Sequence, residues 1–384
     1  MENMNDDVLT SEMKAHAKRW GVDLVGVLDA GPIHTKTYLR SKYRAYRCGQ
    51  GIHTETEPDM FDPRVVMPGA CSVILLGTYT YGVDYIVPST PGCPRGKTGP
   101  WTRLYHYMSG QMAAVVIDFL KERGYEAVYT NDLPYRTIAA MAGIGEIGRN
   151  HFLFTKEFGS YIRMSCVVTN ARLHSDRVDY DFVKDRCGKC HICVDSCPTG
   201  AMHMDGAYDY DICLHQLLQG AGDAKKDGLP REYWGKTDSY LMRTGKCLEV
   251  CPRNRHLIPR ESIPAYIKVF PDFNKPDSPK LIPLVLADDQ ELEWLLAAGT
   301  YKYGKNHIRQ NAILALGQQK DPAAIPVLSE CLLTSKERLN AQMAAWALGM
   351  ISGDDSIAAL KKAAAVRTEP EILEEIGNAL NGVH

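Results

Sequence analysis

Seven of the 12 cysteines in this 384-residue chain lie in one stretch, between Cys187 and Cys251. The first four have the spacing of bacterial two-cluster ferredoxins, Cys187-x2-Cys190-x2-Cys193-x3-Cys197-Pro198. In such a run three thiolates hold one cluster and the fourth binds the other cluster of the pair. The spacing predicts two iron–sulfur clusters, so the fold must bring together thiols that are far apart in sequence.

The rest of this stretch supplies too few thiols for two complete clusters. Cys247-x3-Cys251-Pro252 repeats the end of the run, so we expect Cys251 to complete the cluster begun by the first three cysteines. The second cluster is then left with Cys197, Cys213 and Cys247. A distant cysteine, His215, or an open or missing iron would account for the eighth position. The distant candidates are Cys48, Cys71, Cys93, Cys166 and Cys331.

Zinc is the alternative metal, because tetrahedral zinc sites also use paired cysteines. It does not explain three cysteines at successive x2 spacing or two Cys-Pro endings. Disulfides are not expected for a chain of this length in a reducing compartment. Iron–sulfur clusters are therefore the favoured interpretation.

Composition restricts the cellular setting more than the function. Lys+Arg 44 and Asp+Glu 46 give a formal charge of -2, so no global charge attracts nucleic acid. The sequence has no apolar run of about 18 residues, and its first residues are polar. We expect a cytoplasmic monomer with no membrane contact.

The first part of the chain alternates helical and strand patterns. Helices are expected near 11–20 and 112–120, and strands at 24–28, 72–76 and 127–129. We expect a layered α/β domain in which the first two strands are central. The long Gly-, Pro- and Tyr-rich stretch 79–102 is typical of a lid, a binding loop or disorder, and we expect a cofactor cover.

The last hundred residues contain a repeat. A shift of 32 superposes Ala312–Gly317 on Ala344–Gly349, a second shift reaches Ile376–Leu380, and Leu328 and Leu360 have the same spacing. Helical pairs repeated at this period predict HEAT-like repeats, with a plain helical bundle as the alternative. Basic residues at the start of the repeats are candidate phosphate contacts, namely Lys302, Lys305, His307 and Arg309.

The order of these features resembles the tRNA epoxyqueuosine reductase family, which is related to cobalamin-dependent reductive dehalogenases. The resemblance includes AGIGEIGRN at Ala142–Asn150, the Phe158–Ser160 step and RQNAILALG in the repeats. It implies three domains: an α/β cobalamin-binding domain (1–175), a ferredoxin-like double 4Fe-4S domain (176–275) and HEAT-like helical repeats (276–384).

The resemblance also implies site residues. A proton donor is expected at Asp132, with Tyr135 as the competitor and Arg136 or Arg149 as helper; Asp132 is alternatively a turn residue. Candidate cobalamin contacts are Gly143, Gly145, Gly148, Arg149, Asn150, His106 and Ser160. The three glycines also satisfy a dinucleotide fingerprint, but they follow a helical pattern at 136–142 rather than a strand, so a nicotinamide site is not expected.

Departures from the family pattern leave alternatives open. Thr244 stands where the family usually has the first cysteine of a Cys-Asp-Asp-Cys pair, and Gly145–Asn150 is closer to the dehalogenase form. The leading expectation is reduction of epoxyqueuosine to queuosine in a tRNA anticodon loop, with electrons from a ferredoxin or flavodoxin. A dehalogenase-like small-molecule reductase and an electron-transfer or corrinoid-activating protein are the alternatives.

Overall fold

The computed structural model describes residues 2–34, 60–82, 87–99, 105–176, 187–204, 209–220, 228–262, 264–267, 278–288, 292 and 305–383. The chain forms two compact units. Unit 1 comprises 1–83, 104–209 and 246–271, and unit 2 comprises 84–103, 210–245 and 272–384. Each unit takes part of the cysteine-rich stretch, and the division into three domains stays a prediction.

Unit 1 is built on a four-stranded sheet with the order β1-β4-β9-β6, in which every neighbouring pair is antiparallel. The sheet strands are β1 (Leu24–Asp29), β4 (Ser72–Tyr79), β6 (Ala127–Thr130) and β9 (Ile162–Thr169). Around them lie α1 (Glu2–Arg19), β2 (Ile33–His34), β3 (Met60–Phe61), α3 (Pro63–Val66), α4 (Tyr105–Lys121), α5 (Tyr135–Met141), β7 (Glu146–Ile147), β8 (Leu153–Phe154), α6 (Ile192–Asp195), α9 (Lys246–Glu249) and η3 (Pro252–Asn254).

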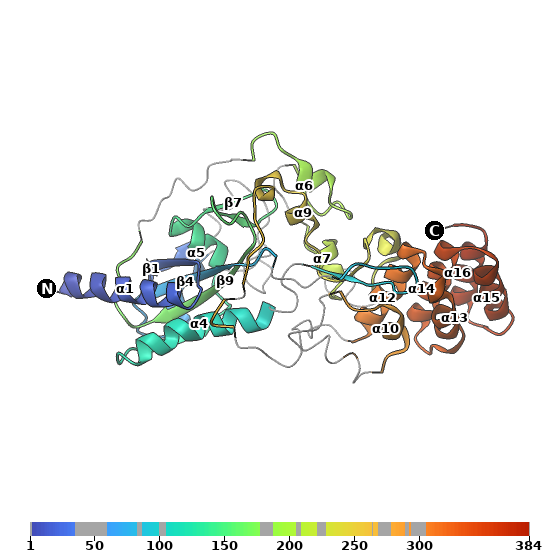
Figure 1. Ribbon diagram of the computed structural model, residues 1–384, viewed down its shortest axis with the longest axis horizontal. Helices are drawn as coiled ribbons and strands as arrows, with labels where there is room; N and C mark the ends of the chain where they lie inside the picture. The colour runs from blue at the N-terminus through green and yellow to red at the C-terminus, as the bar shows by residue number, and fades with distance from the viewer. Residues whose placement is uncertain are drawn as a thin grey trace. The chain divides into compact units, whose positions relative to one another are not determined.

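Helices cover both faces of this sheet. Side chains alternate along a strand, so Leu75 and Cys166 pack with Ile138 of α5, while Thr78 contacts Met112 of α4 from the other face. Figure 1 shows α4 and α5 on opposite sides of the sheet. All residues of β4 and β9 are buried as a result.

The expected helices and strands of unit 1 are confirmed, with one correction. β4 is central as predicted, but β1 forms an edge of the described sheet, so the prediction that both are central is wrong. An apolar run such as Leu24–Leu28 is compatible with either position because one well-packed face is enough to favour apolar residues.

Unit 2 contains the helical repeats. Its helices are α7 (Leu214–Leu217), η2 (Arg231–Lys236), α10 (Ile282–Leu286), α12 (Lys305–Gln319), η5 (Pro322–Ala324), α13 (Ile325–Thr334), α14 (Arg338–Ile351), α15 (Asp354–Ala364) and α16 (Pro370–Leu380). The three superposed segments fall on α12, α14 and α16, and α14 packs against both of the others. The predicted period therefore corresponds to one helical pair (Figure 1).

The repeats share their core with residues that precede them in sequence. Trp234 packs edge-on against Trp346 with ring centroids 6.2 Å apart. Asn311 of α12 donates hydrogen bonds of 2.8 Å to the carbonyl oxygens of Leu218 and Leu241. Part of the cysteine-rich stretch thus folds together with the repeats, which the sequence analysis did not predict.

The described part of the stretch 79–102 is also packed into unit 2. β5 (Lys97–Thr98) pairs in parallel with β10 (Tyr240–Met242), and the Gly92 N–H donates to Asp321 at 2.8 Å. These main-chain contacts attach 87–99 to the repeats. A function of this stretch as a cofactor cover stays a prediction.

Two of the basic candidates in the repeats take part in packing. Arg309 donates to the carbonyl oxygen of Ala287 at 2.6 Å. His307 is half-buried against Gly220, and burial lowers its pKa, which favours the neutral ring. Lys302 and the side chain of Lys305 lie outside the described residues. Arg309 and His307 are thus explained by contacts within the unit.

None of the helices formed by the described residues is long and apolar enough to cross a membrane.

Two glycines of the repeats are expected to respond oppositely to alanine. A Cβ on Gly317 would lie 2.8 Å from the Ala347 Cα, so Gly317→Ala should force α12 and α14 apart. We expect overpacking of ~1–3 kcal/mol to exceed the helix-propensity gain of ~1 kcal/mol, lowering the thermal unfolding midpoint measured by circular dichroism.

Gly377→Ala in α16 is the matched control, because nothing lies within 4 Å of the added Cβ. This variant should unfold at an equal or higher temperature. A Gly317→Ala protein at least as stable as Gly377→Ala would contradict the close approach of the two helices.

Candidate metal centre

The structure brings together the four thiols predicted for the first cluster. The pKa of the Cys193 thiol is raised to about 11, chiefly by burial and then by the charges of Cys187, Cys251 and Cys190. Burial also raises the pKa of Cys251, and Cys187 and Cys190 add to the shift. Cys251 therefore lies in the electrostatic neighbourhood of the run at Cys187–Cys193, as its spacing predicted.

The chemistry of this donor set fits an iron–sulfur cluster. Within the described ranges, no group of three or more His, Cys, Asp or Glu residues is arranged to hold a single metal ion. Four neighbouring, half-buried thiols, three of them at successive x2 spacing, suit a 4Fe-4S cluster.

A short hairpin, β7–β8, holds the run Cys187–Cys190. The Arg149 N–H in its turn donates to the Cys187 sulfur at 3.4 Å. The Arg149 guanidinium donates to the carbonyl oxygen of Gly188 at 2.9 Å and to that of Cys190. Arg149, which is only 8% exposed, thus contacts the main chain between two of the thiols.

The same hairpin holds the second cysteine segment. The Asn150 side chain donates to the carbonyl oxygen of Cys247 at 3.0 Å. Glu146 forms an ion pair with Arg253 at 2.5 Å, and Arg253 lies over the Phe154 ring. Because Arg253 follows Cys251-Pro252, the hairpin contacts both segments that supply the thiols.

A buried asparagine gives the second segment a further connection to unit 1. Asn254 accepts a hydrogen bond of 3.0 Å from the Ser160 N–H and donates one of 2.8 Å to the Leu248 carbonyl oxygen. Gly159 has a φ of +52°, and a Cβ there would lie 2.4 Å from the Asn254 Oδ1. Glycine at this position allows Asn254 to approach the main chain beside Ser160.

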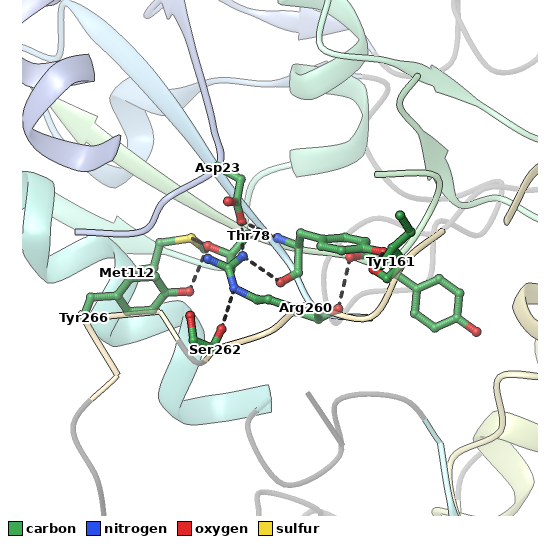
Figure 2. Close-up of polar contacts among 10 residues, drawn as sticks. Asp23, Thr78, Met112, Tyr161, Arg260, Ser262 and Tyr266 are labelled. Carbon is green, nitrogen blue, oxygen red and sulfur yellow. Dashed lines mark hydrogen bonds and ion pairs between the residues drawn. The ribbon is translucent and has the colours of Figure 1, made fainter. Parts of the chain in front are cut away.

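The chain beyond Asn254 is anchored to the sheet (Figure 2). Arg260 forms an ion pair of 2.6 Å with Asp23 and donates to the Tyr79 carbonyl oxygen at 3.2 Å. The Tyr266 hydroxyl lies 2.8 Å from the Thr78 Oγ1. These bonds hold the chain on the C-terminal side of Cys251 against the end of β4.

The glycines of AGIGEIGRN are explained by contacts within the hairpin. A Cβ on Gly145 would lie 2.4 Å from the Phe154 carbonyl oxygen, and a Cβ on Gly148 would lie 2.6 Å from the Phe154 ring. Gly143 has a φ of +71° just after α5, where the chain turns. A direct contact of these glycines with cobalamin stays a prediction.

The thiols expected at the second cluster are divided between the units. Cys197 and Cys247 belong to unit 1, whereas Cys213 precedes α7 in unit 2. Also in unit 2, the His215 Nδ1 lies 3.3 Å from the carbonyl oxygen of Thr244. If Nδ1 carries the proton, the Thr244 carbonyl oxygen accepts a hydrogen bond from it, which fixes the tautomer of the ring; His215 as a cluster ligand stays a prediction.

Four of the distant cysteines that were candidates for the eighth cluster ligand lie in packed cores or in turns. Cys166 lies in the core of the sheet and Cys331 in the core of the repeats. The Cys71 sulfur donates to the Gly69 carbonyl oxygen at 3.6 Å, and Cys93 forms a turn with Thr90. Cys48 lies outside the described residues.

The remaining predicted residues lie on the loop between β6 and α5 and on the helices α4 and α5. Asp132 is exposed between β6 and α5, and its N–H donates to the Thr130 Oγ1 at 3.0 Å. Tyr135 is the first residue of α5, and the Arg136 guanidinium lies 5.8 Å from its ring centroid. His106 lies in α4, and its side chain is outside the described set.

Sequence reasoning missed Glu146, Arg253, Asn254 and the function of Arg149 as a contact of the cysteine run. A signal was present for two of them, because Arg253 and Asn254 directly follow Cys251-Pro252. Residues next to metal ligands often orient those ligands through hydrogen bonds. The sequence did not show which strands Arg253 and Asn254 would contact.

The thiols of Cys187, Cys190, Cys193 and Cys251 form the first group of thiols. Removing one of them should remove one cluster. We expect Cys251→Ala, reconstituted without oxygen, to hold about four fewer irons per chain than the parent protein, because loss of one of four thiolate ligands destabilises the cluster. Cys331→Ala is the control, since that thiol is buried between α13 and α14 and contacts the Asn340 carbonyl oxygen. Equal iron in Cys251→Ala and the parent would contradict the four-thiol assignment.

Comparison with known proteins agrees with these observations. Residues 186–254 match a 4Fe-4S double cluster binding domain, and residues 301–381 match HEAT repeats. An epoxyqueuosine reductase of Bacillus cereus is 29% identical, covering 98% of this chain and 98% of its own.

Solved structures extend the likeness over the whole chain. The epoxyqueuosine reductase of Bacillus subtilis, solved with its aspartate-containing catalytic loop swung out of the active site, has a TM-score of 0.76 and 26% identity, covering 98% of this chain and 99% of its own. A structure of an epoxyqueuosine reductase with an epoxyqueuosine-modified tRNA-Tyr stem loop has a TM-score of 0.75 and 26% identity, with 98% of each chain covered. Over nearly its full length, this chain is therefore similar to epoxyqueuosine reductases in sequence and in fold.

Proposed function

We propose that the protein is a cobalamin- and iron–sulfur-dependent reductase that converts epoxyqueuosine to queuosine in a tRNA anticodon loop. The main support is that the four neighbouring thiols of Cys187, Cys190, Cys193 and Cys251 occur in a chain that matches epoxyqueuosine reductases over nearly its full length. A relative bound to a modified tRNA stem loop supports tRNA as the substrate.

The reaction determines what the chain must supply. Removal of an epoxide oxygen as water, leaving a carbon–carbon double bond, consumes two electrons and two protons. The thiol groups hold clusters that pass electrons singly, and we propose a reduced ferredoxin or flavodoxin as their source. Cobalamin, when bound, supplies a strongly reducing and nucleophilic cobalt centre.

We assign the proton donor to Asp132. Three features support this choice: its carboxyl group is exposed, it lies on the loop between β6 and α5, and a relative has a catalytic loop containing an aspartate. The bond from its N–H to Thr130 orders the loop without occupying the carboxyl group. Tyr135, three residues further on, is the alternative donor.

Substitutions separate the two donors. We expect Asp132→Asn to lower turnover of an epoxyqueuosine-containing stem loop by about 10²–10⁴-fold, since a positioned acid contributes that much. Tyr135→Phe should retain most activity, and so should Asp118→Asn, which removes an exposed carboxylate of α4. Product is measured by mass spectrometry of digested RNA, with iron and cobalt per chain as the check on loading.

Loss of activity in Tyr135→Phe but not in Asp132→Asn would identify Tyr135 as the proton donor. If the loaded parent protein does not convert the modified stem loop, tRNA is the wrong substrate. Halide release from halogenated phenols would then favour a small-molecule reductase. Reduction of a separate corrinoid protein would favour an electron-transfer function.

A further inference from the structure

Unit 1 has a buried cation, Arg149, beside the thiol of Cys187. Arg149 lies in the turn of the β7–β8 hairpin, and its main-chain N–H points to the Cys187 sulfur. Its guanidinium spans the main chain from Gly188 to Cys190. It therefore contacts the loop between two of the proposed ligands from three donors at once.

The charge of Arg149 is not neutralised by these bonds, because both guanidinium acceptors are neutral carbonyl oxygens. The second nearby cation, Arg253, differs, since it is paired with the buried carboxylate of Glu146. Reduction adds one negative charge to a cluster. A buried positive charge, and an N–H directed at a ligand sulfur, both stabilise that added charge.

We propose that Arg149 is a positioning residue that holds the Cys187–Cys190 loop and raises the reduction potential of the cluster bound by Cys187, Cys190, Cys193 and Cys251. The proposal rests on the iron–sulfur assignment within the proposed function. It makes this cluster an easier acceptor for one electron from a reduced carrier of the ferredoxin class. No proton or bond change accompanies that step.

Three variants test the proposal. Arg149→Gln removes the positive charge and some of the guanidinium N–H donors, whereas Arg149→Lys keeps the charge. Lys189→Gln removes an exposed charge from the Cys187–Cys190 loop. Each full-length protein is reconstituted with iron and sulfide and titrated with dithionite under electron paramagnetic resonance. The signal that Cys251→Ala lacks identifies the cluster in question.

At the parent midpoint, Arg149→Gln should lower the ratio of reduced to oxidised cluster about tenfold, which is about 59 mV for one electron. Arg149→Lys and Lys189→Gln should each stay within about threefold of the parent, since a retained charge still acts and an exposed one is screened by water. Signals of any other cluster should not move, which provides an internal reference.

An Arg149→Gln protein that assembles the cluster with an unchanged ratio would overturn the proposal. An equal shift in Lys189→Gln would also overturn it, because any loop charge would then suffice. If Arg149→Gln binds no iron, the lysine variant decides: a cluster with the parent ratio supports a required cation, and no cluster leaves Arg149 with a folding role only.

The titration requires neither cobalamin nor tRNA. Failure of the protein to reduce epoxyqueuosine would therefore leave this result intact, and an unchanged potential would leave the proposed substrate intact.

Discussion

The first group of thiols depends on one close packing contact, in which the Phe154 carbonyl group occupies the space that a side chain at Gly145 would fill. This contact closes the β7–β8 hairpin. The closed hairpin directs Arg149 to the Cys187–Cys190 loop and directs Glu146 and Asn150 to the segment 247–253. The proposed cluster ligands are thus positioned by residues that are not themselves proposed ligands.

The sheet provides the second constraint. Its central strands are buried on both faces, so the loops at the ends of these strands begin from a rigid base. Arg260 and Tyr266 attach the chain that follows Cys251 to the end of β4, and Ser160 just before β9 holds Asn254. The segments on both sides of the hairpin contacts are therefore connected to the same core.

Patterns with short-range causes were predictable from the sequence. The cysteine spacing predicts Cys251 as the partner of Cys187, Cys190 and Cys193, because cubane geometry restricts how thiols are spaced, and these four thiols lie in one electrostatic neighbourhood. The repeat period placed α12, α14 and α16, because stacked helical pairs bury similar faces. The edge position of β1 and the packing of 210–245 with the repeats were not predictable, since local apolarity does not specify a partner.

The function of Arg149 illustrates the same limit. From the sequence, the glycine-rich segment predicts a cofactor contact, which stays a prediction, and the structure adds that Gly145 and Gly148 lie close to Phe154. The sequence alone determined the chemistry of the chain: iron-binding thiols, helical repeats and the resemblance to a reductase family. Tertiary structure decided which charged side chains surround those thiols, because a buried charge is positioned by long-range packing that local spacing does not encode.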